Sequence, residues 1–333
     1  MRVLVTGSTG FLGSQLCRAL VQRGDQVVAF HRPSSWLRGL EGLPVEHAAG
    51  DLTRPETLAP AMQGVDVVFH AAALLDADRQ PGKAYTVTVE GTRAVLEAAL
   101  QAGVQRVVHT SSVAALGLPS GGMPLTEDST WNCPPDRWLY GYTKYLAELE
   151  VQAAVARGLD AVIVNPTYVL GPGDLYRQSS SPVVLVAERR IPALVEGGLN
   201  VVHVHDVIAG HLAALEHGRC GHRYLLGGEN MTVSELINRI AAAAGVPAPR
   251  VWVPGTAARR LGRLLRAAGS LFSFPLSPHL LELAGYNFWV DTQKSRAQLR
   301  LGTQRSADQA IRDAYAWFVE AGAIRRSHSS SGS

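Results

Sequence analysis

The sequence predicts an α/β fold in which a doubly wound parallel sheet carries a smaller, mostly C-terminal unit. In the first half, short β-rich runs alternate with helical stretches, and the runs are apolar on both faces. Strands buried between two helix layers have this pattern. Glycines that end helices precede the next strand. The predicted strands are 2–6, 26–31, 65–71, 105–110 and 161–165, the helices are 12–23, 55–62, 84–102 and 137–157, and the glycines are Gly24, Gly64, Gly103 and Gly158.

The alternation stops after Asn165, where the turn-rich stretch NPTYVLGPGD begins. A strand and a helix return at 199–218. We therefore expect the second unit at the carboxyl ends of the strands, where open α/β sheets bind ligands. The expected boundaries are 1–165 with a returning segment at about 199–225 for a dinucleotide-binding domain, 166–198 and 226–325 for a substrate-binding unit, and 326–333 for a disordered tail.

Composition narrows the functional class. The formal net charge of +3 is too small to indicate a nucleic-acid surface. The chain has three scattered cysteines, which predict no disulfide framework and fit a reducing cytoplasm. Its apolar runs are shorter than a membrane span of ~18 residues. We expect a cytoplasmic protein that acts on a small molecule.

A glycine-rich turn joins the first predicted strand to the first helix. In TGSTGFLG, Gly7 allows a tight turn, Gly10 allows close approach of a pyrophosphate, and Gly13 lets the helix pack on the strand. Free N–H groups at the helix start would face the phosphates. This turn predicts a Rossmann-type dinucleotide site, and its expected contacts are Gly7, Thr9, Gly10, Phe11, Leu12 and Gly13.

The end of the second strand discriminates between the two nicotinamide dinucleotides. NAD sites usually carry an acid there for the ribose 2′-hydroxyl. Here the strand ends in HRPSS, so Arg32 stands where a 2′-phosphate would lie. NADP(H) is therefore favoured over NAD(H). After the third strand, Asp51 and Leu52 are expected near the adenine, although Asp51 could equally be a turn or helix-cap residue.

The stretch LYGYTKYLAE holds the candidate catalytic pair. Tyr140 and Lys144 are spaced i, i+4 and so share a helix face. A nearby ammonium would lower the pKa of a phenol, which could then give a proton to an alkoxide. Ser111 and Ser112, just past a strand end, offer a hydroxyl for the same oxygen. The core-facing stripe of this helix is predicted to be Tyr142, Leu146, Leu149 and Ala153.

Together these motifs resemble the extended short-chain dehydrogenases/reductases. The resemblance rests on TGSTGFLG, Asp51-Leu52, HAAA at 70–73, TSS at 110–112, YGYTK at 140–144 and NPTYVLGPGD, and it covers nearly the whole chain. HTSSVAALGLP and VIVNPTYVLGPGD look like the dihydroflavonol-4-reductase-like branch, which includes hopanoid-associated sugar epimerase-like sequences.

The resemblance implies roles for single residues. Tyr140 would be the general acid/base, and Lys144 would lower its pKa and hold the nicotinamide ribose. Ser112 rather than Ser111 would bind the substrate oxygen, because it precedes Gly117 by the family's usual offset. Further cofactor contacts would be Ala71, Ala72 and Ala73 on the adenosine side and Pro166, Thr167 and Val169 along the nicotinamide.

The predicted function is an NADPH-dependent carbonyl reductase, or the reverse alcohol dehydrogenase. One alternative is an NAD-dependent sugar-nucleotide epimerase, with Arg177, Arg189 and Arg190 available to a diphosphate. Another is a nucleotide-sensing module without catalysis, although such modules usually lose the tyrosine or lysine. The candidate pocket walls are Leu74, Leu75, Trp131, Trp138 and Tyr168, whose alternative role is ordinary loop packing.

Three other patterns bear on metals and partners. Histidines cluster between 203 and 222, but their spacing fits no recurring zinc pattern, so no metal is expected; Asp206 is read there as a helix N-cap. In the basic stretch 258–269, the leucines Leu261, Leu264 and Leu265 are predicted to pack on the second unit, which makes membrane contact unlikely. The long helices 84–102 and 137–157 could pair in a homodimer.

Overall fold

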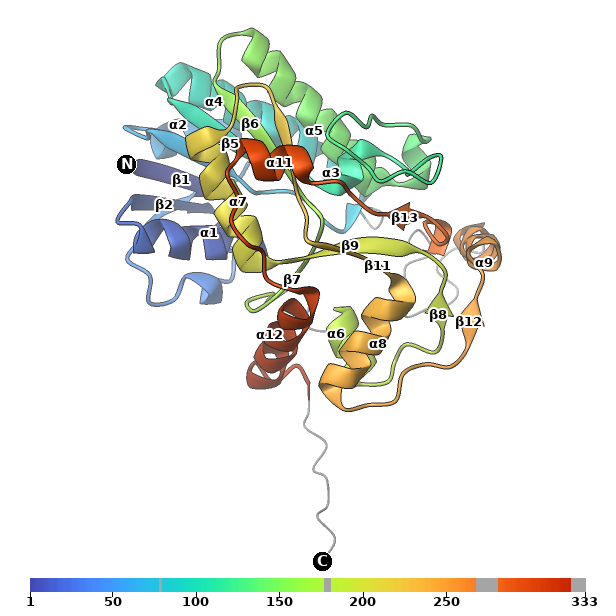
Figure 1. Cartoon of the computed structure of the whole chain (residues 1–333). Coiled ribbons are helices and arrows are strands. Elements are labelled where there is room, and N and C mark those ends of the chain that lie inside the picture. Colours follow the sequence, from blue (N-terminus) through green and yellow to red (C-terminus); the bar gives the residue numbers. More distant parts are fainter. Residues whose placement is uncertain (78–79, 177–180, 268–280, 325–333) are drawn as a thin grey trace, which may run out of the picture.

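A seven-stranded parallel sheet forms the centre of the larger half of the molecule (Figure 1). The computed structural model describes residues 1–77, 80–176, 181–267 and 281–324. The strand order is β10-β6-β5-β4-β1-β2-β3. The chain adds β2 and β3 on one side of β1 and then crosses to β4 on the other side, so the strand order reverses between β1 and β4. This arrangement confirms the predicted α/β fold with a parallel doubly wound sheet. The strands are β1 (Arg2–Thr6), β2 (Gln26–His31), β3 (Glu46–Ala49), β4 (Val67–His70), β5 (Arg106–Thr110), β6 (Ala161–Pro166) and β10 (Arg223–Leu226).

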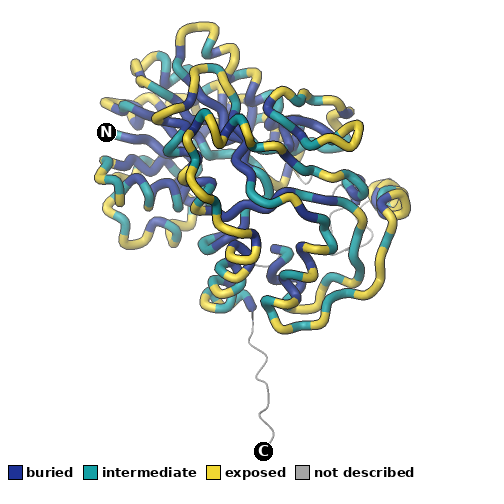
Figure 2. Tube along the Cα trace, viewed as in Figure 1, coloured by how far each residue is buried: buried dark blue, intermediate teal, exposed yellow. Residues whose placement is uncertain are grey.

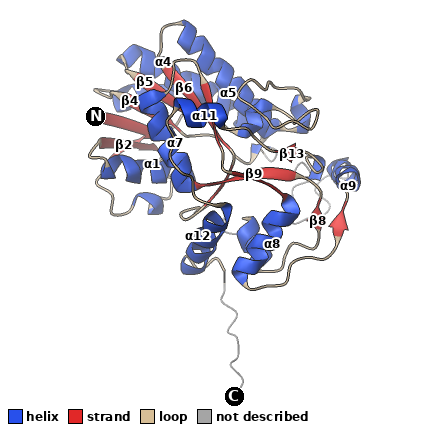
Figure 3. Ribbon diagram, viewed as in Figure 1, coloured by secondary structure: helices blue, strands red, loops and turns tan. Residues whose placement is uncertain are grey.

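Helices cover both faces of this sheet (Figure 3). Because successive strand residues point to opposite faces, Val3 and Val5 of β1 pack in one apolar cluster and Leu4 in the other. α1 (Phe11–Gln22) and α7 (Val204–His217) contribute to the first cluster. The second cluster receives side chains from α2 (Leu58–Ala61), α4 (Gly91–Ala102) and α5 (Leu139–Ala156).

Turns and short helices explain where these elements end. Gly24, Gly64, Gly103 and Gly158 all have positive φ, as expected of glycines that close helices. The helix predicted at 84–102 begins earlier, with α3 (Pro81–Tyr85), and passes through a π-helical turn at Thr86–Glu90 before α4. The shorter helices are η1 (Arg38–Leu40), η2 (Pro55–Thr57), η5 (Val113–Leu116) and η6 (Pro135–Arg137).

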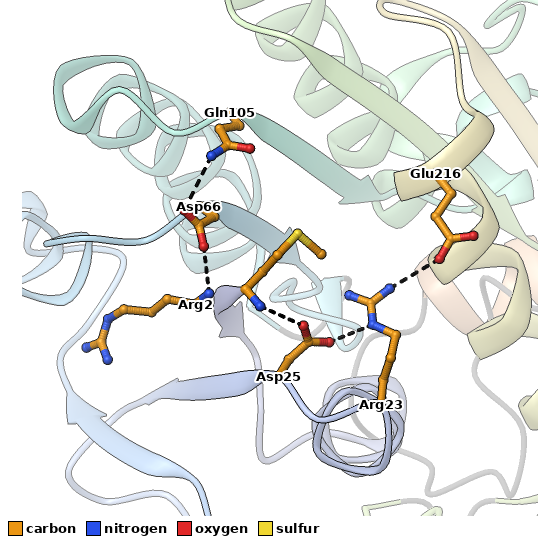
Figure 4. Close-up of polar contacts among 7 residues, drawn as sticks. Arg2, Arg23, Asp25, Asp66, Gln105 and Glu216 are labelled. Carbon is orange, nitrogen blue, oxygen red and sulfur yellow. Dashed lines mark hydrogen bonds and ion pairs between the residues drawn. The ribbon is translucent and has the colours of Figure 1, made fainter.

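Polar contacts join the amino ends of the strands (Figure 4). The Arg2 amide donates to Asp66 Oδ2 at 2.7 Å, and Gln105 Nε2 donates to Asp66 Oδ1 at 3.3 Å. Asp25 accepts from Arg23 Nε at 2.6 Å, and Arg23 also pairs with Glu216 of α7 at 3.5 Å. These contacts stabilise the amino ends of the strands. The glycine-rich turn lies at the carboxyl ends.

The second unit is built around a small sheet and three helices. β9 (Gly198–His203) pairs with β7 (Tyr168–Leu170), β11 (Glu229–Thr232) and β13 (Asn287–Phe288). α6 (Pro182–Ala187), α8 (Val233–Ala244) and α12 (Ala307–Glu320) share an apolar cluster with β7, β9 and β11. The remaining elements are β8 (Leu194–Val195), β12 (Trp252–Val253), α9 (Gly255–Ala267) and α11 (Gln293–Gln298).

The chain returns to the first domain later than the expected segment 199–225. β9 belongs to the second sheet, so the return begins with α7 and ends with β10 at the edge of the large sheet. The predicted N-cap Asp206 is wrong, because His203 precedes α7 and its Nδ1 accepts from the His205 amide at 3.0 Å. The expected tail 326–333 lies outside the described residues.

Two predicted helix faces are wrong. On α5, Leu149 and Ala153 are exposed, and the buried residues are Gly141, Thr143, Lys144, Ala147, Glu148, Val151 and Ala154. On α9, Leu261 and Leu264 are exposed instead of packing on the second unit. In both helices a glycine lies on the buried side, where neighbouring backbone approaches closely. A Cβ on Gly141 would come within 2.7 Å of the Ala114 carbonyl oxygen.

The described residues include no helix long and apolar enough to cross a membrane. Within the same ranges, no group of three or more His, Cys, Asp or Glu side chains could hold a metal ion. The histidines have other partners. His203 Nε2 lies 3.1 Å from Asp313, and His211 lies between Thr110 Oγ1, at 2.9 Å, and the Val207 carbonyl oxygen, at 2.8 Å.

Candidate active site

The glycine-rich turn is shaped by close backbone contacts. Gly7 has a φ of +65°, and a Cβ there would come within 2.8 Å of the Ala72 backbone. A Cβ on Gly13 would lie 2.0 Å from the Gly7 carbonyl oxygen, so only glycine lets α1 approach the turn. The Gly10 amide donates to the same oxygen at 2.9 Å. This geometry fits a pyrophosphate cradle at the start of α1, whose first turn carries no acidic residue.

The neighbouring predicted contacts divide into two groups. Ala71 and Ala72 follow β4 and pack against Gly7, which places them beside the turn at the point where the strand order reverses. Thr9 is buried, whereas Phe11 and Leu12 are partly buried against the core beneath α1. The Ser8 hydroxyl, which the sequence reading omitted, donates to the Phe30 carbonyl at 3.0 Å and ties the turn to β2.

Arg32 follows β2 and is exposed. The positive charge of Arg32 helps to lower the pKa of the nearby Asp51 carboxyl group. Asp51 Oδ1 accepts from the amide and the hydroxyl of Thr53, both at 2.9 Å, so the carboxylate serves as a turn residue. Burial raises the pKa of Asp51, but the Thr53 hydrogen bonds and the charges of Arg32 and Arg54 outweigh it and lower the pKa overall. Leu52 is buried in the core below α4, where it contacts Gly91.

The segment after β5 presents two serines in different surroundings. Ser112 is partly buried and extended, and its Oγ accepts from the Ala114 amide at 3.2 Å, so its hydroxyl hydrogen remains available to a ligand. Asn165 Nδ2 donates to the Ser112 carbonyl at 3.0 Å. Ser111 is buried, and its Oγ contacts no hydrogen-bond partner among the described residues.

Lys144 reaches the end of β5 from the second turn of α5. Its Nζ donates to the Thr110 carbonyl at 2.6 Å, two residues before Ser112. The side chain is only 2% exposed, and burial lowers its pKa to about 8. The negative charge of Glu148 acts in the opposite direction and raises this pKa. Tyr140 is partly buried in the first turn of the same helix, on the face of Lys144. α5 and β5 therefore bring the predicted lysine and serine to one strand end, with the tyrosine one helical turn away.

The buried carboxylate of Glu148, next to Lys144, was not predicted from the sequence. Glu148 accepts from Asn165 Nδ2 at 2.6 Å and pairs with Arg223 at 3.3 Å. Its position four residues after Lys144 was the available signal, but only the β6 and β10 contacts show that it is buried.

Two buried histidines lie on the strands beside this lysine. His70 Nδ1 is 2.7 Å from Thr6 Oγ1, and its Nε2 is 2.9 Å from Thr92 Oγ1. The His70 and His109 rings lie 5.2 Å apart. Burial, with the charge of Lys144, lowers the pKa of His70 to about 3 and holds that of His109 well below its ordinary value. Both imidazoles are therefore neutral, and Lys144 is the cation of this group.

Aromatic rings pack around the start of α5. Trp131 stacks on Tyr145 with ring centroids 6.0 Å apart, and Trp138 meets Phe288 edge-on at 5.2 Å. A Cβ on Gly141 would lie within 3.1 Å of either tryptophan, so both flank the residue next to Tyr140. Of the other predicted pocket walls, Leu74 donates its amide to Thr88 Oγ1 at 3.2 Å, Leu75 is exposed, and Tyr168 packs against the core of the second unit.

The segment after β6 crosses to the second sheet. Pro166 is buried at the strand end. Thr167 Oγ1 donates to Asn200 Oδ1 at 2.8 Å, and Val169 packs toward the core beneath α1. Of the three arginines considered for a diphosphate, Arg190 pairs with Glu188 at 3.3 Å, Arg189 is exposed, and Arg177 lies outside the described residues.

Comparisons with known proteins agree with this geometry. Residues 3–227 match the NAD dependent epimerase/dehydratase family. The chain is 36% identical over 96% of its length, and 95% of the other, to a protein from Synechocystis sp. named as a dihydroflavonol 4-reductase. It is also 36% identical to sterol demethylase protein B of Methylococcus capsulatus, over 97% of this chain and all of that one.

A solved structure also matches nearly end to end. The crystal structure of PA4631, described as a nucleoside-diphosphate-sugar epimerase from Pseudomonas aeruginosa, aligns with a TM-score of 0.82 at 28% identity and covers 98% of this chain and 99% of that one. The glycine turn, the strand order and these matches lead to one conclusion. The chain belongs to the NAD dependent epimerase/dehydratase family of extended short-chain dehydrogenases/reductases, in the dihydroflavonol-4-reductase-like branch.

Proposed function

We propose that this protein is an NADPH-dependent carbonyl reductase, or the reverse alcohol dehydrogenase, with Tyr140, Lys144 and Ser112 as its catalytic residues. The observation that carries the proposal is the buried Lys144 ammonium, which lies one helical turn from Tyr140 and donates to the carbonyl of Thr110, two residues before Ser112. A lysine with no catalytic use would rarely be retained at 2% exposure, because burying its charge is unfavourable.

Each residue has a defined task in this proposal. Bound nicotinamide dinucleotide would supply the hydride, and the turn around Gly7 and Gly13 would hold its pyrophosphate. Tyr140 gives its phenolic proton to the substrate oxygen as negative charge develops there. Ser112 donates a hydrogen bond to the same oxygen, and the Lys144 ammonium stabilises the phenolate that Tyr140 becomes. In the oxidative direction the phenolate takes the proton back.

The carbonyl-reductase mechanism is tested by Tyr140→Phe. We expect turnover of a carbonyl panel, followed at the NADPH absorbance, to fall by about 10²–10⁴-fold, because general acid catalysis contributes that much. Cofactor affinity should change little. The matched controls are Tyr142→Phe and Tyr145→Phe, which remove the same hydroxyl from the same helix. Full activity in Tyr140→Phe would refute the mechanism.

We further propose that the cofactor is NADP(H). Arg32 is exposed at the end of β2, where a 2′-phosphate would lie. The carboxylate of Asp51, the nearby acid, accepts hydrogen bonds from the amide and the hydroxyl of Thr53. Arg32→Asp should weaken NADPH binding by roughly tenfold to a hundredfold, the value of a hydrogen bond to a charged group, and should favour NADH. Arg18→Asp on exposed α1 is the control. Equal affinity of the unaltered protein for both dinucleotides, measured by titration, would contradict the assignment.

The epimerase alternative keeps one specific support, the nucleoside-diphosphate-sugar epimerase structure at 28% identity. An epimerase of this kind would retain NAD and recycle its hydride. Purification of the protein followed by identification of any bound nucleotide separates the two: retained NAD together with sugar-nucleotide turnover supports epimerisation, and exchangeable NADP(H) supports reduction.

We also propose a homodimer formed through α4 and α5. A surface groove of about 530 Å³ runs between α2, α4 and α5, and ion pairs join Arg93 to Glu150 and Arg157 to Glu97 across it. Ala153 of α5 lines this groove and is exposed, and Leu149, one helical turn earlier, is also exposed. Light scattering should give a dimer, and Ala153→Arg should give a monomer with its fold intact.

A further inference from the structure

Helix α9 turns two of its three leucines, Leu261 and Leu264, to solvent, and Leu265 is partly buried. Leu261 is 42% exposed and Leu264 is 69% exposed, whereas Gly255, Ala258 and Gly262 are buried on the opposite side. At the place of α9 the tube in Figure 2 is mostly yellow, the colour of exposed residues. A helix that only packs on the protein buries its large apolar residues. In α9 the small residues face the protein, whereas Leu261 and Leu264 are exposed to solvent.

Two arginines, Arg259 and Arg266, hold the helix in this orientation. Arg259 donates to the Ala284 carbonyl and lies 5.6 Å over the Tyr286 ring. Arg266 pairs with Glu282 at 3.1 Å and donates to the Asp136 carbonyl at 3.1 Å. A Cβ on Gly255 would come within 2.5 Å of Gly285, so the backbones touch. Rotation of α9 to bury its leucines would break all of these contacts.

The outward side of α9 is also basic. Arg260 and Arg263 are exposed beside the two leucines. The helix carries four arginines and no acidic residue. Immediately before it, Val251 is 60% exposed and Trp252 of β12 is 55% exposed, and β12 lies next to α9 at the same edge of the molecule (Figure 1). Arginines beside exposed leucines and a tryptophan are typical of helices that lie in the interface of a bilayer.

We propose that the outer face of α9, made of Arg260, Leu261, Arg263 and Leu264, docks the protein on an anionic phospholipid surface. The two leucines enter the interface, and the arginines bind lipid phosphates while their stems cover apolar surface. The charges on this face have one sign, which matches an anionic surface. The exposed apolar side chains at this edge, Leu261, Leu264, Val251 and Trp252, are too few for a stable protein interface, which buries about 800 Å² on each partner.

Docking would bring the bilayer close to the segment that precedes the candidate catalytic helix. Arg266 binds the Asp136 carbonyl, four residues before Tyr140, and Arg137 donates to the Tyr286 hydroxyl at 2.9 Å. Tyr286 thus lies between Arg137 and Arg259, which couples α9 to the start of α5. The docking itself does not depend on the proposed reaction, so it can be tested by binding alone.

The experiment is flotation of the full chain with phosphatidylcholine vesicles that contain or lack phosphatidylglycerol. We expect binding to the anionic vesicles, weak binding to the neutral ones, and loss of binding at high salt. Arg260→Gln with Arg263→Gln should weaken binding about twentyfold, because each basic residue near an anionic surface contributes about fivefold. Leu261→Ser with Leu264→Ser should weaken it at least tenfold.

Matched controls alter the same residue types elsewhere. Met123→Ser removes an exposed apolar side chain, and Arg18→Gln with Arg312→Gln removes two exposed charges from other helices. Both controls should bind like the unaltered protein, and thermal unfolding checks that every variant folds. Absence of binding to anionic vesicles, or equal binding by the α9 variants, overturns the proposal. Self-association that the leucine variants abolish would instead identify a second copy as the occupant and would also overturn it.

Discussion

Helices α5 and α9 both expose leucines and both bind neighbouring carbonyl groups through basic side chains, but α5 buries two of its charged residues and α9 keeps its own at the surface. In α5, Lys144 and Glu148 are almost completely buried and close to strands β5 and β6. In α9, Arg259 is partly buried and Arg266 is exposed, and both bind carbonyl groups at the surface. Deep burial changes the acid–base behaviour of a charged group, whereas a charge at the surface mainly holds two segments together.

The largest contrast is expected between Lys144→Met and Arg259→Met. The lysine change should abolish turnover, because the Tyr140 phenolate loses its cation, and yet it should stabilise the fold. The lowering of the lysine pKa from 10.5 to about 8 corresponds to an unfavourable burial free energy on the order of 3 kcal/mol, which the substitution removes. Loss of the hydrogen bond to Thr110 offsets about 1–2 kcal/mol of this gain in stability. Arg259→Met should keep turnover and cost stability. Urea unfolding and NADPH oxidation measure both effects.

The pH dependence of the lysine effect supplies a control. The cost of burying the ammonium is present in full below about pH 8, because the folded pKa is lower than the unfolded one, and it disappears as pH rises from about 8 to 10.5. The stability advantage of Lys144→Met should shrink over that window. An advantage that is constant with pH would show that the ammonium is not the cause.

The buried histidines should make the large sheet sensitive to acid. Burial lowers the pKa of His211 to about 4, so its neutral form contributes stability that is present above pH ~6.5 and is lost as pH falls toward 4. We expect a loss of about 2 kcal/mol at pH 5 from this residue. His211→Gln should flatten the urea-midpoint profile between pH 7 and 5, whereas exposed His217→Gln should not. Identical profiles for the three proteins would refute the assignment.

The smallest expected effect concerns the carboxylates that pair with the two helices. Glu148 raises the pKa of Lys144, so Glu148→Gln should move the alkaline limb of the turnover profile to lower pH. Glu282→Gln removes the partner of Arg266 on α9 and should leave the profile in place. A profile that moves equally in both variants would mean that the limb does not report on Lys144.

The glycine-rich turn and the tyrosine–lysine pair were predictable because both depend on local spacing. The close contacts at Gly13 come from Gly7 and Ser8, a few residues away, and residues at i and i+4 share a face in any helix. The wrong faces of α5 and α9 have a shared cause. A helical period shows that two faces exist, but which one lies inside depended on backbone from η5 beside Gly141 and from the segment at Gly285 beside Gly255.

By itself the sequence determined the parallel doubly wound sheet, its glycine turn and the helix that carries Tyr140 and Lys144, because these depend on periodicity and on steric limits near each residue. Only the tertiary structure decided that Lys144 is buried beside neutral His70 and His109, that Glu148 lies behind it, and that Leu261 and Leu264 face solvent. The physical reason is that burial and electrostatic environment are set by neighbours distant along the chain, which no local pattern specifies.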